Sequence, residues 1–176
     1  MRKVLVTGAA GFIGPHAVDS YVELGHEVEV IDSMSAGKES NKRKDVAYHN
    51  IDIRNPKISN IFNKVNFEAV NHHAAQINVR KSTQNPTFDA DVNILGTLKL
   101  LQNVVDNEVG KFIFASTGGA IYGDQEHLPV PKSSPTNPVS PYGVSKLTVE
   151  RYLHYYNTEY GLNYNVLRYS NVYGPR

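Results

Sequence analysis

The chain opens with a short apolar run that leads into the stretch Thr7-Gly8-Ala9-Ala10-Gly11-Phe12-Ile13-Gly14, after which an amphipathic segment extends to Leu24. A strand, a glycine-rich turn and a helix in this order are what a nucleotide-binding loop requires. Gly8 can form the tight turn, Gly11 leaves space for a pyrophosphate, and Gly14 lets the helix pack close to the strand. The positive end of the helix would then face the phosphates. The alternative is a structural turn, because G-x-x-G-x-x-G alone is a weak signal.

Composition and charge are those of an ordinary globular protein. The chain has 176 residues, of which 40% are apolar, and a formal net charge of +1. This length is enough for one domain with a hydrophobic core, and the balanced charge predicts no nucleic acid partner. The absence of cysteine excludes disulfides and thiolate metal ligands. No segment has the length of a membrane span and no signal peptide precedes the first strand, so we expect a cytoplasmic protein without a membrane partner.

Apolar runs typical of strands alternate with amphipathic segments typical of helices. This alternation predicts an α/β fold with a doubly wound parallel sheet of the Rossmann type, with helices on both faces. The six predicted strands are Lys3–Val6, Glu27–Ile31, Val46–Asn50, Glu68–His73, Lys111–Ala115 and Asn163–Tyr169. The predicted helices are Phe12–Leu24, Asn55–Lys64, Pro86–Asn107 and Pro141–Tyr160, and a proline-rich loop is expected between Gly118 and Ser140.

Residues 1–176 are predicted to form one nucleotide-binding domain. The last residues, Ser170–Arg176, look like part of a functional loop rather than a domain boundary. We therefore expect the chain to be the N-terminal half of a longer protein, truncated before a substrate-binding domain.

Asp32 ends the second predicted strand, where it can reach a nucleotide bound at the glycine loop. A carboxylate there can accept hydrogen bonds from both ribose hydroxyls of an adenosine and would repel a 2′-phosphate. The position therefore favours NAD over NADP. A solvated aspartate in a turn is the alternative.

Tyr142 and Lys146 are four residues apart at the start of a predicted helix, so they share one face. To act as a base near neutrality, the tyrosine must lower its pKa from about 10 by roughly three units, or about 4 kcal/mol. A lysine ammonium and an oxidised nicotinamide ring can both favour the phenolate. Ser116 or Thr117, at the end of a neighbouring strand, can offer a hydroxyl to a substrate oxygen. Alone, the Tyr-x-x-x-Lys pair is most simply an ordinary helix face.

Other strand ends are expected at the same edge of the sheet. Asp52-Ile53 would sit beside the adenine, and the small residues of Ala74-Ala75-Gln76 would let the backbone approach the middle of the cofactor. His72 and His73 are adjacent on a strand and must point to opposite faces, so one of them is expected in the core or the wall. No second cluster of ligand residues accompanies them, and no metal site is predicted.

Six motifs that occur in order along the chain resemble those of the extended short-chain dehydrogenase/reductases and, within them, the UDP-glucose (UDP-galactose) 4-epimerases. They are Thr7-Gly-Ala-Ala-Gly-Phe-Ile-Gly14, His73-Ala-Ala-Gln76, Asn93-Ile-Leu-Gly-Thr97, Ser116-Thr-Gly-Gly-Ala-Ile-Tyr-Gly123, Tyr142-x-x-x-Lys146 and Leu167-Arg-Tyr-Ser-Asn-Val-Tyr-Gly-Pro-Arg176. One departure is Pro15, where the family usually has serine, and its effect should be local.

The resemblance implies bound NAD, with Tyr142 as the base, Lys146 on the nicotinamide ribose and Thr117 as the hydroxyl partner, Ser116 being its alternative. It also implies that Asn171 contacts the sugar nucleotide together with Thr117 and Tyr142. The full predicted cofactor set is Gly8, Gly11, Phe12, Ile13, Gly14, Asp32, Ser33, Ser35, Gly37, Asp52, Ile53, His73, Ala74, Ala75, Gln76, Asn93, Tyr142, Lys146 and Tyr169.

The implied activity is NAD-dependent 4-epimerisation of a UDP-sugar through a transient 4-keto intermediate. Dehydratases and decarboxylases of nucleotide sugars are the alternatives within the family. Dehydratases resemble one another in placing Asp-Glu directly after the hydroxyl residue, whereas Gly118-Gly119 follow Thr117 here. For these 176 residues alone, with little or no activity expected, a non-catalytic NAD-binding module is a further alternative.

Two predicted helices, Pro86–Asn107 and Pro141–Tyr160, carry more apolar residues than one face against a sheet needs. In the family these helices pair across a dimer, which implies a homodimer here. The excess apolar residues of the second helix are Leu147, Leu153, Tyr155 and Tyr156.

Overall fold

The computed structural model describes residues 1–125 and 128–175, so Arg176, the last residue of the sixth motif, lies outside the described residues. The described chain contains a six-stranded sheet with the order β3-β2-β1-β4-β5-β6, in which every neighbouring pair is parallel. The predicted Rossmann-type sheet is therefore confirmed. Its strands are β1 (Lys3–Thr7), β2 (Glu27–Asp32), β3 (Ala47–Asn50), β4 (Ala69–His72), β5 (Lys111–Thr117) and β6 (Tyr164–Tyr169).

The register of the sheet brings the carboxyl ends of its strands to one edge. Thr7 at the end of β1 lies opposite His72 at the end of β4, and Thr117 at the end of β5 lies opposite Tyr169 at the end of β6. In open parallel sheets, ligands bind at this edge, where the order of the strands reverses between the first strand and its two neighbours. The fold thus gathers most of the predicted site residues at a single place.

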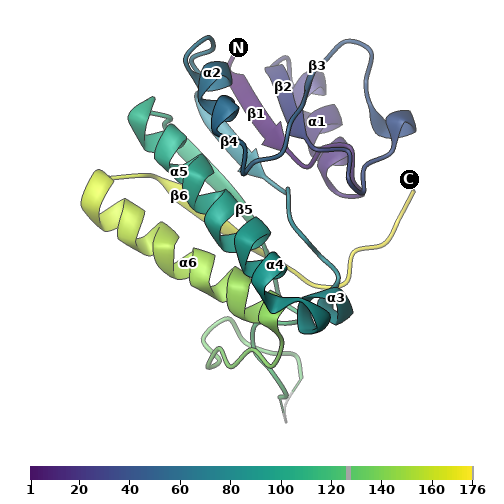
Figure 1. Ribbon diagram of the computed structural model, residues 1–176, viewed down its shortest axis with the longest axis vertical. Helices are drawn as coiled ribbons and strands as arrows, with labels where there is room; N and C mark the ends of the chain where they lie inside the picture. Colours follow the sequence, from purple (N-terminus) through teal and green to yellow (C-terminus); the bar gives the residue numbers. More distant parts are fainter. Residues whose placement is uncertain (126–127, 176) are drawn as a thin grey trace.

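Helices cover the two faces of the sheet unequally (Figure 1). The helices are α1 (Gly14–Glu23), α2 (Ser59–Phe62), α3 (Val79–Gln84), α4 (Pro86–Ala90), α5 (Gly96–Asp106) and α6 (Pro141–Tyr160), with short 3₁₀ turns at Glu39–Asn41 and Pro56–Ile58. One face packs on α2, α5 and α6, and α1 covers β1 and β2 on the other. On the face that α1 occupies, the side chains of Asn165 and Leu167 in β6 remain exposed.

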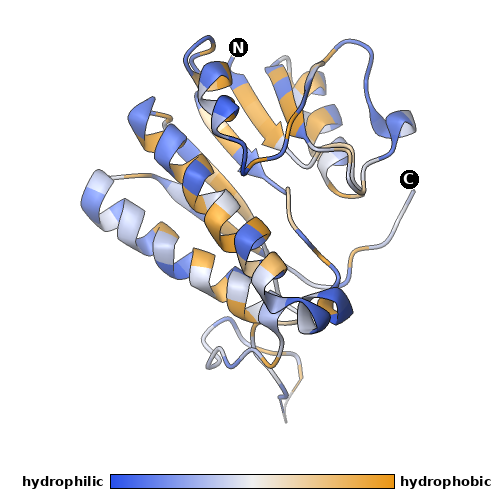
Figure 2. Ribbon diagram, in the orientation of Figure 1, coloured by the Kyte–Doolittle hydropathy of each residue, from blue (hydrophilic) through white to orange (hydrophobic). Residues whose placement is uncertain are grey.

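The core follows the alternation of side chains along each strand. Leu5, Val70 and Phe112 belong to the larger cluster, on the side of α5 and α6, whereas Val4 and Val6 pack with α1. Figure 2 shows β1 as hydrophobic along most of its length and a hydrophobic stripe along α5. No helix in the described part of the chain is long and apolar enough to cross a membrane.

Several helices differ from the prediction. Helix α1 begins at Gly14 rather than Phe12, with Pro15 in its first turn. Helix α3 was not predicted, because its sequence VRKSTQ has no apolar periodicity and is fixed instead by Asn78, whose side chain accepts a hydrogen bond from the Lys81 amide. The predicted helix Pro86–Asn107 is present, but α4 and α5 are joined by a π-helical segment, Asp91–Leu95.

Helix α6 matches its predicted bounds. Ser140 accepts a hydrogen bond from the Gly143 amide at its start, and Gly161 ends it with a φ of 68°. Two of the residues predicted for a dimer interface, Leu153 and Tyr156, are instead buried in the core of this chain. That part of the prediction is wrong, because these two side chains lie on the helix face that packs against the sheet and α5. Tyr155 is exposed.

Candidate functional site

The glycine loop is closed by backbone contacts that leave no space for side chains. Gly8 has a φ of +72°, and a Cβ atom there would lie 2.5 Å from the amide nitrogen of Ala74. A Cβ atom on Gly14 would lie 2.5 Å from the carbonyl oxygen of Gly8. The tight turn at Gly8 and the close packing at Gly14 are therefore as predicted, and the loop presents backbone to the edge of the sheet.

Asp32 is buried beside this loop. One of its carboxylate oxygens accepts a hydrogen bond from the Ala10 amide at 2.8 Å, and the other accepts one from the Met34 amide at the same distance. The next segment packs closely on both, since a Cβ atom on Gly37 would lie 2.6 Å from Ala10 Cβ and 3.2 Å from Asp32 Oδ1. The two amides fix the orientation of the carboxylate against the loop, where it can accept further hydrogen bonds.

Asn41 is a residue of this site that sequence reasoning missed. Its buried side-chain amide donates hydrogen bonds to the carbonyls of Ala10 and Gly11, at 3.0 and 2.6 Å. The Lys38 amide also donates to Ala10, at 2.9 Å. These bonds hold the glycine loop against the segment 38–41. An asparagine in a polar loop gives no local signal of such a role, because the carbonyls it binds lie about 30 positions earlier in the chain.

Tyr142 and Lys146 lie on the same side of α6, as predicted. The Lys146 side chain is 4% exposed, its Nζ donates a hydrogen bond to the Ala115 carbonyl at 2.9 Å, and it lies 5.8 Å from the centre of the Tyr142 ring. The same Nζ lies 4.7 Å from the ring centre of Phe114. The ammonium is thus held between β5 and the phenol.

Burial shifts both groups. It lowers the pKa of Lys146 to about 8, against the opposing effect of the Asp89 charge. It raises the pKa of Tyr142, and the nearby Asp89 raises it further. The lysine alone therefore does not lower the phenol's pKa, which means that the shift a catalytic base needs must come from additional positive charge.

The structure separates the two candidate hydroxyls, Ser116 and Thr117. Ser116 is buried and donates a hydrogen bond to Glu150 Oε1 at 2.6 Å, and Glu150 is in turn paired with Arg168 at 2.6 Å. Thr117 is the next residue on β5, so its side chain points to the opposite face, where it is half-buried and accepts a 3.2 Å hydrogen bond from the Ala120 amide. This arrangement favours Thr117 as the group open to a ligand.

His72 belongs to a chain of buried hydrogen bonds in which the donor and acceptor of each bond can be assigned. Thr97 donates its hydroxyl proton to the Asn93 carbonyl at 2.7 Å, so His72 Nε2 must donate to Thr97 Oγ1 at 2.9 Å. His72 Nδ1 then accepts from the Thr7 hydroxyl at 2.6 Å, and Thr7 Oγ1 accepts from the Ala74 amide at 3.2 Å. Burial holds the pKa of His72 well below its usual value, in agreement with a neutral ring. His72 is therefore the core histidine of the pair.

His73 points the other way and has a different environment. Its ring stacks on Tyr169 with 6.3 Å between the ring centres, and among the described residues neither buried ring nitrogen has a hydrogen-bond partner. Burial, with a smaller effect of the Lys146 charge, lowers its pKa to about 4. The ring therefore forms a flat wall with Tyr169 at the ends of β4 and β6, on which a planar group could pack.

The loop after β4 is tied to the π-helical segment. The Gln76 amide donates to Asn93 Oδ1 at 2.8 Å, and Asn93 Nδ2 donates to the Gln76 carbonyl at 2.9 Å. Asn93 is buried, so its side chain positions this loop rather than facing open space. In the same way Arg54 holds both oxygens of Asp52, at 2.9 and 2.7 Å, which lowers the pKa of that carboxyl.

The remaining predicted residues are less closely assembled. Ile53 is buried, and the hydroxyls of Ser33 and Ser35 lie 3.0 Å apart. Phe12 and Ile13 are half-buried, as are Ala74 and Ala75. Asn171 is exposed in the segment after β6, which runs away from α6 towards α1 (Figure 1) and which His16 Nε2 contacts at the Pro175 carbonyl, at 3.1 Å.

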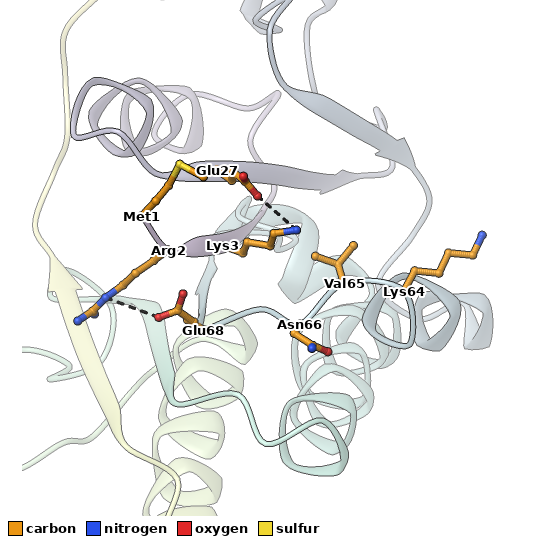
Figure 3. A pocket seen from close by; sticks show the side chains of 8 residues that line it. All are labelled: Met1, Arg2, Lys3, Glu27, Lys64, Val65, Asn66 and Glu68. Carbon is orange, nitrogen blue, oxygen red and sulfur yellow. Dashed lines mark ion pairs between the residues drawn. The ribbon is translucent and has the colours of Figure 1, made fainter.

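A separate hollow of about 460 Å³ lies at the opposite, amino-terminal ends of β1, β2 and β4 (Figure 3). Ion pairs between Lys3 and Glu27, at 3.3 Å, and between Arg2 and Glu68, at 3.8 Å, cross its rim. None of the predicted site residues lines it. Across the described residues, no group of three His, Asp or Glu side chains could hold a metal ion.

The glycine loop at the carboxyl edge of a parallel sheet and the buried Tyr-x-x-x-Lys pair are features of an extended short-chain dehydrogenase/reductase. Residues 4–176 match the family model described as the NAD dependent epimerase/dehydratase family. The chain belongs to this family, and the predicted resemblance is confirmed.

Similar proteins carry related names. A protein of Methanocaldococcus jannaschii, named provisionally as a UDP-glucose 4-epimerase, is 46% identical over 173 residues, which are 98% of this chain and 57% of that protein. The crystal structure of the Thermotoga maritima UDP-glucose 4-epimerase with UDP-glucose has a TM-score of 0.97 and 45% identity, over 99% of this chain and 57% of that one. The UDP-glucose 4-epimerase of Thermus thermophilus in complex with NAD has a TM-score of 0.96 and 44% identity, with the same coverage. This chain therefore spans about 57% of the length of these relatives.

The pKa of His73 predicts a measurable pH dependence of stability. Its folded pKa of about 4 lies below the usual value of 6.5, so between these values the unfolded chain binds more protons and stability falls as the pH drops. His73→Phe cannot titrate and keeps a ring on Tyr169. Between pH 7 and pH 5, the variant should gain about 2 kcal/mol in unfolding free energy relative to the original chain. Urea denaturation at both pH values measures this difference.

His154→Phe, which removes an exposed histidine from α6, is the matched control. A His73→Phe variant whose stability falls with pH as steeply as that of the original chain would show that the His73 ring is not held neutral in the folded state.

Proposed function

We propose that this chain serves the NAD-dependent 4-epimerisation of a nucleotide sugar of the UDP-glucose/UDP-galactose type. The observation that carries the proposal is the position of Tyr142 and buried Lys146 on one face of α6, beside the end of β5 that bears Thr117. The relatives' names and the UDP-glucose in the Thermotoga maritima structure support the substrate class. In this proposal residues 1–176 form the cofactor-binding domain.

The residues present fit NAD. The side-chain-free loop at Gly8 and Gly14 gives a pyrophosphate access to backbone N–H groups, and the oriented carboxylate of Asp32 can accept hydrogen bonds from the ribose. The wall formed by His73 and Tyr169 can cover one face of a ring at the other end of the site.

The chain's own residues would then handle the proton. NAD held by these residues would supply hydride chemistry at C4 of the sugar. Tyr142 removes the proton of the C4 hydroxyl and gives it back to the oxygen after the 4-keto sugar has turned over. The charge of Lys146, added to that of an oxidised nicotinamide ring, would favour the phenolate, and Thr117 hydrogen-bonds the C4 oxygen of the sugar. The pair Gly118-Gly119 supplies no carboxylate, which favours epimerisation over dehydration.

Cofactor choice is a first test. Asp32 would repel a 2′-phosphate, so this chain should bind NAD more tightly than NADP, and Asp32→Ala should weaken NAD binding. Isothermal titration calorimetry with both nucleotides measures each affinity. Equal or tighter binding of NADP by the original chain would contradict the role of Asp32 in excluding a 2′-phosphate.

Catalysis is tested in the full-length protein by conversion of UDP-galactose into UDP-glucose. Tyr142→Phe should lower turnover by roughly 10²- to 10⁴-fold and leave NAD bound, because only the proton path is lost. Thr117→Val should lower turnover as well, whereas Ser116→Ala serves as the comparison, since its hydroxyl is used by Glu150. Full activity in Tyr142→Phe would mean that the base is misassigned, and no conversion by the unaltered protein would refute the proposed activity.

A homodimer through α6 is part of the proposal. Val144, Tyr152 and Tyr155 lie on one side of the helix and are 48, 38 and 49% exposed. A hollow of about 350 Å³ beside them is lined by Thr148 and Arg151 as well as the two tyrosines. Exposed apolar side chains gathered at helical spacing are typical of a helix that packs against a partner.

Sedimentation velocity over a range of concentrations tests the homodimer. The original chain should show a concentration-dependent dimer, and Tyr152→Glu should shift it to monomer because it places a charge in the apolar patch. Leu24→Glu, at the exposed end of α1, is the control. A monomer at all concentrations would refute the interface.

A further inference from the structure

Asp89 is a fully buried carboxylate that no predicted motif includes. It lies in α4, and it accepts three hydrogen bonds from three different parts of the chain. Its Oδ1 accepts from Gln76 Nε2 at 2.9 Å and from Asn93 Nδ2 at 3.1 Å, and its Oδ2 accepts from Ser145 Oγ at 2.7 Å. The carboxylate therefore joins the loop after β4, the π-helical segment and α6.

The partners of Asp89 belong to segments that also carry residues of the candidate site. Ser145 lies within the turn that carries Tyr142 and Lys146, so its hydrogen bond to Asp89 holds that turn in place. The backbone of Gln76 is paired with Asn93, and the loop to which it belongs adjoins the backbone contact at Gly8. Asp89 thus links the helix that carries Tyr142 and Lys146 to the loop at Gln76.

We propose that Asp89 is a positioning residue of the reaction, which holds the turn Tyr142–Lys146 in register with the loop at Gln76 through the hydrogen bonds of one carboxylate. This inference rests on the proposed function as far as the reaction is concerned. The arrangement it describes is a property of the chain itself and can be measured without a reaction.

The charge of Asp89 also matters for Lys146. The groups that act on the lysine from the elements around it are Tyr142 on α6, His72 and His73 on β4, and Asp89 on α4. Burial lowers the pKa values of both histidines and raises that of Tyr142, whereas the charge of Asp89 raises the pKa of Lys146. Replacing this carboxylate by an amide of the same shape would remove the charge and keep the size of the side chain.

Two variants separate the effect of the Asp89 charge from the effect of its hydrogen bond to Ser145. Asp89→Asn keeps the size, and its carboxamide can still accept from Gln76 and Asn93 and donate to Ser145, so the charge is removed with most of the bonding intact. Ser145→Ala keeps the charge and cuts the link to α6. Asp106→Asn, which neutralises an aspartate on α5 whose carboxylate accepts from Gln102, is the matched control.

The first measurement is an NMR titration of Lys146 in the 176-residue chain, with side-chain ¹³Cε labels and assignment by Lys146→Met. In the original chain its pKa should be about 8. Asp89→Asn should lower this pKa by about one unit or more, and Asp106→Asn should leave it unchanged. The second measurement is NAD binding by calorimetry, which Asp89→Asn and Ser145→Ala should each weaken by about tenfold through loss of a charge-assisted hydrogen bond.

An unchanged Lys146 titration in a folded Asp89→Asn variant would overturn the proposal. If Asp89→Asn does not fold, Ser145→Ala decides, and unaltered NAD affinity in that variant would overturn the link to α6. If the original chain binds no NAD but Asp89→Asn still shifts the Lys146 titration, the proposed function fails while the effect of Asp89 on the lysine stands.

Discussion

The site depends on the close approach of two backbone segments, at Gly8 after β1 and at Ala74 after β4. A side chain at Gly8 would occupy the place of the Ala74 amide, so the two strand ends can meet only there without one. The same amide donates to Thr7, from which the buried hydrogen bonds run through His72 and Thr97. One steric constraint therefore sets the spacing of the glycine loop, the loop after β4 and the helix that carries Thr97.

Buried hydrogen bonds fix the positions of side chains around the candidate site more closely than apolar packing does. An apolar cluster is tolerant of small shifts, whereas a buried hydrogen bond is lost when its partners move by a fraction of an ångström. In this chain such bonds surround the candidate site, with Ser116 held by Glu150, Lys146 by the Ala115 carbonyl and Asp32 by two backbone amides. The edge of the sheet that carries the candidate site is therefore held by buried polar contacts as well as by apolar packing.

The sheet, the glycine loop and the helix of Tyr142 could be predicted from the sequence because their signals are local: apolar runs, turn residues and spacing. Asn41 and Asp89 could not, because each acts on groups that are distant in sequence and neither has a pattern around it. The polar helix α3 was missed for want of apolar periodicity. The environment of Tyr142 also lay beyond the sequence, since the direction in which burial moves its pKa is set by side chains that only the fold brings together.

The π-helical segment between α4 and α5 accommodates one more residue per turn than the α-helix around it. Each residue of an α-helix corresponds to a rotation of about 100°. If the same residues formed a regular α-helix without the wide turn, α4 would be turned by about that angle relative to α5. Asp89 would then face away from Ser145 while Thr97 kept its place. The π-helical turn therefore sets the rotation between α4 and α5. It allows Asp89 to reach Ser145 and Thr97 to reach His72 from one continuous helix.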